Sequence, residues 1–130
     1  PDEFVRGVFV PDPTAVAGSG LTARSSFLKL GSRAYLVISI AMAAVVLVLD
    51  ARARITSARV AVGACSAVAL RLGTLEATLV GHALAPGIGA IVRADHLAGL
   101  SPIDDVRGTA EYRLEAAQVL VRRALEELAR

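Results

Sequence analysis

The residue that stands out for its chemistry is Lys29, the one lysine among the 14 Lys and Arg residues of this chain. It is followed by Gly31 and Arg33, and then by an uncharged run, residues 34–49. A lysine beside a glycine-containing turn can contact an anionic or electron-rich ligand, because glycine lets a backbone approach closely. The alternative is a solvated lysine on an exposed strand face, since most lysines are exposed. The residues alone leave both open.

The histidines and the cysteine do not form a recognisable catalytic set. A catalytic zinc needs about three protein ligands, and His82, His96 and Cys65 lack the spacing for one. We expect His82 in a loop after a helix end, and His96 on a helix surface or half-buried. Cys65 has no basic neighbour and is expected to be a buried thiol. Gly87–Gly89 lacks the third glycine of a dinucleotide fingerprint, and the chain has no phosphate-binding loop.

The adjacent carboxylates Asp104 and Asp105 are the remaining candidates. Paired carboxylates can act as acid and base when their surroundings separate their pKa values. Neighbouring acidic residues before a helix more commonly cap it and complement its dipole. We therefore expect helix capping, or an internal salt bridge with Arg107.

Composition narrows the class of protein. Hydrophobic residues make up 55% of the chain, so disorder is not expected. A net charge of +2 with 4% aromatic residues does not give the basic, aromatic footprint of a nucleic-acid-binding protein. The uncharged run is shorter than the ~18 residues of a membrane span and rich in Val, which favours a buried strand.

The single cysteine excludes an internal disulfide and suggests a reducing, cytoplasmic setting. Residues 1–7 contain neither an initiating Met nor a signal peptide, so we expect the chain to be part of a longer protein.

The patterning predicts strands first and helices afterwards. The expected strands are 3–10, 25–30, 34–50 and 55–64, and the expected helices are 70–80, 88–100 and 109–128. Gly81 is expected to end the first helix and Thr109 to cap the last one. The last helix has an apolar stripe, and its polar face is expected to carry Arg113. This order predicts one α+β domain, 1–130, with helices packed on one face of an antiparallel sheet.

A series of motifs occurs along the chain in a characteristic order. They are Phe27–Arg33, Ile38–Ala41, Val60–Ala64, Glu76–Gly81 and Pro102–Arg113. Together they resemble the C-terminal domain of the FAD-binding medium subunit of molybdenum hydroxylases, which include carbon monoxide dehydrogenase and xanthine dehydrogenase. The resemblance extends from about Glu3 to Leu128. The amino-acid sequence of the segment from Lys29 to Ile40 favours a xanthine-dehydrogenase-like member.

The resemblance implies a domain that closes over a flavin held mainly by a preceding FAD-binding domain, absent here. In the family, the lysine of the Phe-x-Lys segment contributes to the flavin site, and here that position is Lys29. An aliphatic residue before the proline that ends the first strand also contacts FAD, and here that is Val5, before Pro11. The segment Asp105–Gly108 is expected to brace the last helix.

The resemblance also implies a function and partners. Electrons would pass from a molybdopterin centre through two 2Fe-2S clusters, in partner subunits, to FAD and then to an acceptor. The isolated chain is expected to be inactive, to bind FAD weakly and to self-associate through its bare docking surface; no nucleic-acid or membrane partner is expected. The alternative is an assembly domain that docks subunits or domains and has no ligand of its own.

Overall fold

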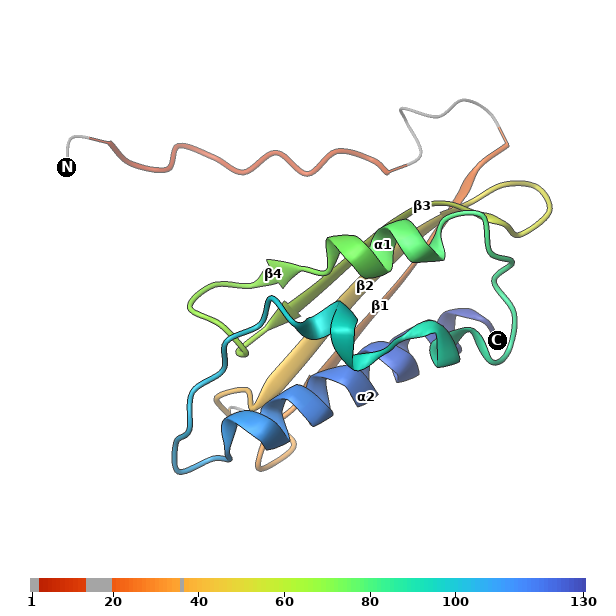
Figure 1. Ribbon diagram of the computed structural model, residues 1–130. Coiled ribbons are helices and arrows are strands. Elements are labelled where there is room, and N and C mark those ends of the chain that lie inside the picture. Colours follow the sequence, from red (N-terminus) through yellow and green to blue (C-terminus); the bar gives the residue numbers. More distant parts are fainter. Residues whose placement is uncertain (1–2, 14–19, 36) are drawn as a thin grey trace.

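The computed structural model describes residues 3–13, 20–35 and 37–130. Its centre is a 4-stranded antiparallel sheet with the strands in sequence order (Figure 1). The strands are β1 (Thr22–Leu30), β2 (Ala41–Leu49), β3 (Ile55–Gly63) and β4 (Leu70–Arg71). The helices are α1 (Gly73–Leu79), α2 (Ala110–Leu128) and the short 3-10 helices η1 (Ile88–Ile91) and η2 (Ala94–Leu97). Both α-helices lie on the same side of the sheet, which confirms the predicted α+β architecture.

Strand β2 is the apolar centre of the domain. It pairs with β1 on one side and β3 on the other, and its alternate residues Ala41, Val45 and Leu47 are fully buried beneath the helices. The predicted strand 34–50 was too long, because the strand begins at Ala41 and the described residues before it form a loop. Among the residues that the structure describes, no helix is long and apolar enough to cross a membrane.

Helix α2 packs its apolar stripe against β1 and β2. The predicted cap is confirmed, because the Thr109 hydroxyl accepts a hydrogen bond from the Tyr112 backbone N–H at 3.2 Å. The fully buried stripe residues are Ala117, Val121, Ala124 and Leu125. This helix is therefore the main cover of the sheet.

The predicted helix 70–80 begins later than expected. Leu70 and Arg71 pair with β3 as a short strand, and the Leu72 N–H donates to the Val60 carbonyl at 2.8 Å. Pairing with β3 keeps Leu70 and Arg71 in an extended conformation, so α1 starts at Gly73. Gly81 follows the helix with a φ of +88°, as expected for a glycine after a helix end.

The predicted helix 88–100 was wrong, because the segment forms the two 3-10 helices. Side chains of α2 occupy its backbone groups instead. The Glu126 carboxylate accepts from the Gly87 and Gly89 N–H groups at 3.0 and 2.8 Å, and the Arg122 guanidinium donates to the Val92 carbonyl at 2.7 Å. The two N–H bonds lower the pKa of Glu126.

Gly89 is required by this close packing. A Cβ at this position would lie 2.9 Å from the Arg122 carbonyl oxygen and 2.9 Å from the Glu126 carboxylate. We expect Gly89→Ala to lower the free energy of unfolding by about 1–3 kcal/mol, because the neighbour is helix backbone that cannot move away. Urea unfolding measures the change, and Gly99→Ala is the control, since a Cβ there meets nothing within 4 Å. Equal losses for the two variants would contradict the prediction.

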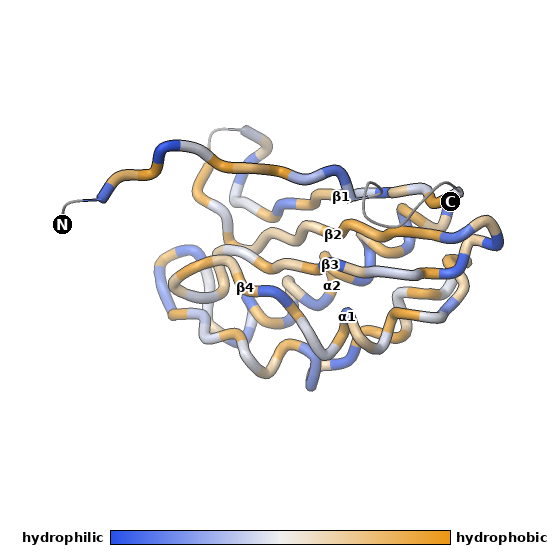
Figure 2. Tube along the Cα trace, turned by 90° about the horizontal axis from the view of Figure 1, so that it is seen from above, coloured by the Kyte–Doolittle hydropathy of each residue, from blue (hydrophilic) through white to orange (hydrophobic). Residues whose placement is uncertain are grey.

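The expected strand 3–10 is not formed. The segment is extended and exposed, and no strand pairs with it among the described residues. Figure 2 shows hydrophobic stretches, separated by a hydrophilic one, on a chain whose first described residues extend beyond the sheet. A strand needs a neighbour for its backbone hydrogen bonds, so an apolar pattern without a partner gives only extended chain.

Candidate functional site

Lys29 lies near the end of β1 on the uncovered side of the sheet. Phe27 and Lys29 point away from the helices, while Leu28 and Leu30 pack against the core, since successive strand residues face opposite sides. We define the open face as the side of the sheet that the helices leave uncovered. Its residues in the three long strands include Ser25, Phe27, Lys29, Met42, Ala44, Val46, Arg59 and Ala61.

The Lys29 ammonium group is held by the loop that joins β1 to β2. Its Nζ donates to the Val37 carbonyl oxygen at 2.8 Å. A shallow pocket surrounds it, lined by Lys29, Leu30, Gly31, Arg33, Ala34 and Val37. A lysine ammonium has three donors, so the bond to Val37 leaves donors for a ligand in this pocket.

Gly31 lets this loop close tightly. A Cβ at Gly31 would collide with the Val37 side chain. The glycine two residues after Lys29 therefore allows the Val37 side chain to pack closely against the backbone.

Ile40 fixes the far end of the same loop. Its N–H donates to the Leu30 carbonyl at 2.8 Å, and its own carbonyl accepts from Nη1 of Arg113 at 2.7 Å. Ile40 is 6% exposed and Arg113 is 3% exposed, so both bonds are shielded from water. Through Ile40, the loop that holds Lys29 is thus hydrogen-bonded both to β1 and to helix α2.

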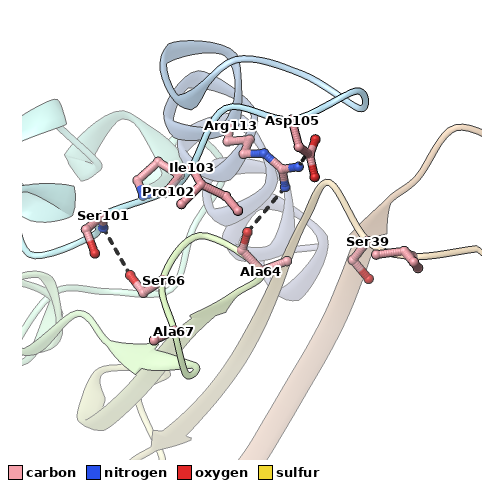
Figure 3. Close-up of a pocket in the computed structure, with 10 residues that line it drawn as sticks. Ser39, Ala64, Ser66, Ala67, Ser101, Pro102, Ile103, Asp105 and Arg113 are labelled. Atoms are coloured by element: carbon pink, nitrogen blue, oxygen red, sulfur yellow. Dashed lines mark hydrogen bonds and ion pairs between the residues drawn. The ribbon is translucent and has the colours of Figure 1, made fainter.

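Arg113 is buried, although the sequence pattern placed it on the polar face of α2. Figure 3 shows its guanidinium between Asp105 and the carbonyl of Ala64, beside a pocket that Ser39 also lines. The spacing of Arg113 could have indicated its burial. Helical spacing places it on the same buried face of α2 as Ala117, Val121 and Ala124. An arginine in that stripe needs a counter-charge, which the partly exposed Asp105 supplies.

Asp105 joins two arginines. Its Oδ1 accepts from Arg113 Nη2 at 2.6 Å, and its Oδ2 accepts from Arg107 Nη1 at 2.8 Å. The backbone N–H of Arg107, together with the two guanidinium groups, lowers the pKa of Asp105 to about 2. A carboxylate held this firmly in its charged form is suited to bracing and not to proton transfer. The expected brace and the expected ion pair with Arg107 are both confirmed.

Asp104 has the other role expected of the carboxylate pair. Its Oδ1 accepts from the Ala110 N–H at the start of α2. The acidic pair is therefore structural, with one carboxylate capping the last helix and the other pairing with arginines.

The remaining candidates for catalysis or metal binding are the cysteine and the two histidines. Cys65 is fully buried, as expected, and burial raises the pKa of its thiol. His82 lies in an exposed loop, also as expected. The expectation for His96 was wrong, because it is 4% exposed and its Nδ1 accepts from the Arg93 N–H at 3.1 Å. Within residues 3–13, 20–35 and 37–130, no group of three His, Cys, Asp or Glu residues could hold a metal.

Val5 lies in the extended segment and is 84% exposed. It is not among the residues that line the pocket around Lys29. Val5 and Lys29, the two predicted flavin contacts, therefore do not share this pocket.

A comparison with protein families identifies the family from the sequence between Ser26 and Leu128. Residues 26–128 match the model of the CO dehydrogenase flavoprotein C-terminal domain. The chain belongs to this family. The resemblance seen in the sequence is thereby confirmed, together with the fold that it implied.

Solved structures of related enzymes have the same fold. A carbon monoxide dehydrogenase from Hydrogenophaga pseudoflava is 28% identical over 85% of this chain, with a TM-score of 0.71. A reconstituted CO dehydrogenase from Oligotropha carboxidovorans is 29% identical over 82%, with a TM-score of 0.69. Quinoline 2-oxidoreductase from Pseudomonas putida 86 is 25% identical over 82%, with a TM-score of 0.73. The match spans 37% of each of these chains, and the comparison with curated proteins gives no match.

Proposed function

We propose that this chain closes over the flavin in the FAD-containing subunit of a molybdenum hydroxylase. A preceding domain would hold most of the FAD, and partner subunits would carry the molybdopterin and the 2Fe-2S clusters, in a cytoplasmic complex. Electrons would pass from the clusters to FAD and on to an acceptor. The observation that carries the proposal is an exposed lysine, held at the edge of the sheet, in a domain of a flavoprotein family.

The residues present fit one side of a flavin site. The Lys29 ammonium is exposed, has spare donors and lies beside a shallow pocket at the end of the open face. Such a cation can stabilise negative charge that develops on a flavin ring, while FAD itself would supply the redox chemistry. No phosphate-binding loop is present in the sequence, which fits a domain that contributes only part of the site.

The test begins with the visible absorbance of the longer protein, expressed with the residues that precede Pro1. We expect a yellow protein with bound FAD. Replacing the cation by Lys29→Met should lower the flavin reduction potential by roughly 30 mV, because the reduced flavin loses a stabilising positive charge. Val5→Ala tests the second predicted contact and should weaken FAD binding.

The control is Arg52→Met, which removes an exposed cation from the hairpin at the opposite end of β2. It should leave the flavin potential unchanged. A colourless protein that cannot be reconstituted with FAD would refute the flavin function. Equal potentials in the Lys29 variant and the unmodified protein would remove Lys29 from the site while leaving the family assignment intact.

A second candidate function is an assembly domain without a ligand. The observation in its favour is the exposed apolar surface of the N-terminal segment, where the exposed fractions of Phe4, Val5, Val8, Phe9 and Val10 are 82–87%. Contiguous apolar surface of this kind marks a docking site. Unchanged flavin spectra in the Lys29 variant, with loss of the subunit complex on Phe4→Ser and Phe9→Ser substitution, would favour assembly over a flavin contact.

A further inference from the structure

We propose that Arg113 is a positioning residue for Lys29. It would act through the backbone of Ile40, from the buried side of the sheet, without touching any ligand on the open face. The flavin role of Lys29 rests on the proposed function, whereas the mechanical link between the two side chains is tested without any flavin.

The link is a chain of short hydrogen bonds. Asp105 holds the Arg113 guanidinium at 2.6 Å, and Arg113 in turn donates to the Ile40 carbonyl at 2.7 Å. The Ile40 N–H donates to the Leu30 carbonyl at 2.8 Å. Leu30 is the direct neighbour of Lys29, and the Lys29 ammonium caps the Val37 carbonyl at 2.8 Å. Each hydrogen bond therefore holds a backbone atom of the loop between β1 and β2, or of the strand beside it.

The burial of these groups makes the link stiff. Ile40 and Arg113 are both almost fully buried, so solvent has little access to the Ile40 carbonyl to replace a lost donor. A buried carbonyl without a partner costs free energy, so the loop would move to find one. Movement at Ile40 displaces Val37, because both belong to the same short connection between β1 and β2. The Lys29 ammonium would then lose its acceptor.

The orientation of the Arg113 guanidinium also points to a role in binding Ile40 as well as Asp105. Its Nε atom is buried and has no hydrogen-bond partner among the described residues. The guanidinium therefore uses its two terminal nitrogens on Asp105, Ile40 and, at 3.4 Å, Ala64, and leaves its third nitrogen unpaired. An arginine whose task was only to neutralise a carboxylate would be expected to use a fork of two nitrogens on it.

The chemistry of lysine gives a direct readout. Formaldehyde with a borane reductant methylates the Lys29 amine, and peptide mass spectrometry reads the rate at this residue in the chain of residues 1–130, without added FAD. Arg113→Gln shortens the side chain and removes the donor to Ile40. We expect the methylation rate of Lys29 to rise roughly five- to tenfold, the effect of one lost hydrogen bond.

The control is Arg122→Gln, at an exposed arginine on the same helix. Arg122 also donates to a loop carbonyl, that of Val92, at 2.7 Å, but that loop does not carry Lys29. This variant reports the effect of general loosening, and we expect less than about a twofold change at Lys29. Gly31→Ala is the positive control, because its Cβ displaces Val37 directly and should raise the rate without touching Arg113.

A folded Arg113→Gln protein with the unmodified rate at Lys29, or the same increase in Arg122→Gln, would overturn the proposal. If Arg113→Gln does not fold, Arg113→Met combined with Asp105→Asn removes the donor and the unpaired charge together, and the same increase is expected. Hydrogen exchange of the unmodified protein gives a check without any variant. The Ile40 amide should exchange as slowly as the amides of β2, and exchange as fast as residues 33–35 would overturn the proposal.

The flavin result separates the two proposals. If Lys29→Met leaves the flavin unchanged, the proposed flavin role of Lys29 fails, while the methylation rates still decide whether Arg113 positions Lys29. If Lys29→Met changes the flavin potential but Arg113→Gln changes neither that potential nor the methylation rate, only the positioning role fails. When both hold, Arg113→Gln should shift the potential in the same direction as Lys29→Met.

Discussion

Asp105→Ala is expected to lower the midpoint of thermal unfolding by on the order of 10 °C. The substitution removes the acceptor of both Arg107 and Arg113. Arg113 is 3% exposed, so the variant leaves a buried positive charge without its counter-charge. Removing one partner of a buried ion pair is strongly destabilising because the other cannot regain its hydration. Circular dichroism during heating measures the change.

The matched control for this prediction is Asp95→Ala. Asp95 also pairs with an arginine, Arg93, at 2.9 Å, but both side chains of that pair are more than half exposed. Exposed pairs contribute little because water replaces the lost partner. An equal shift in both variants would show that burial of Arg113 is not the cause.

Lowering the pH should weaken the interaction of Asp105 with Arg107 and Arg113. The pKa of Asp105 falls from 3.8 to about 2 in the folded chain, so its carboxylate favours folding while it is charged. This contribution is complete above about pH 4 and disappears as the pH falls through about 2. We therefore expect the stability difference between the unmodified chain and Asp105→Asn to be constant near neutral pH and to shrink between pH 4 and pH 2. A difference that grows in this range would contradict the assigned direction.

The second large effect is expected for Leu125→Ala. Leu125 is fully buried in the stripe that α2 packs against the sheet. Truncation removes buried methyl groups and leaves a cavity, so the free energy of unfolding should fall by about 3 kcal/mol. Urea denaturation measures this as a lower midpoint with an unchanged slope.

The control for Leu125→Ala is Val119→Ala on the same helix. Val119 is 41% exposed, so its truncation should change stability by less than about 0.5 kcal/mol. The comparison separates core packing from helix propensity, since both variants place alanine in α2. A loss at position 119 as large as that at 125 would show that the stripe is assigned to the wrong face.

Helix α2 and the β2–β3 hairpin could be predicted from local pattern. The apolar stripe of α2 repeats at helical spacing after a threonine cap, and the short connection at 51–54 allows only antiparallel pairing. The alternation around Lys29 also placed its side chain on the face opposite Leu28 and Leu30. These features depend on neighbours within a few residues, which the sequence displays directly.

Other elements depended on partners distant in sequence. The segment 88–100 became 3-10 turns because Glu126 and Arg122 of α2 take its backbone groups. The segment 3–10 has a strand-like pattern but no strand beside it. A local pattern states which conformation is possible, and the hydrogen-bond partner decides whether it forms.

Motifs and periodicity were enough to recognise the family, to predict the α+β architecture and to single out Lys29 as the residue to test. The burial of Arg113 and its bond to Ile40, 73 residues away along the chain, are seen in the folded domain alone. From its sequence, a charged side chain is expected at the surface until its partner is known. Asp105, at the turn before α2, neutralises Arg113 inside the domain and so turns a polar residue into the link between the last helix and the loop of Lys29.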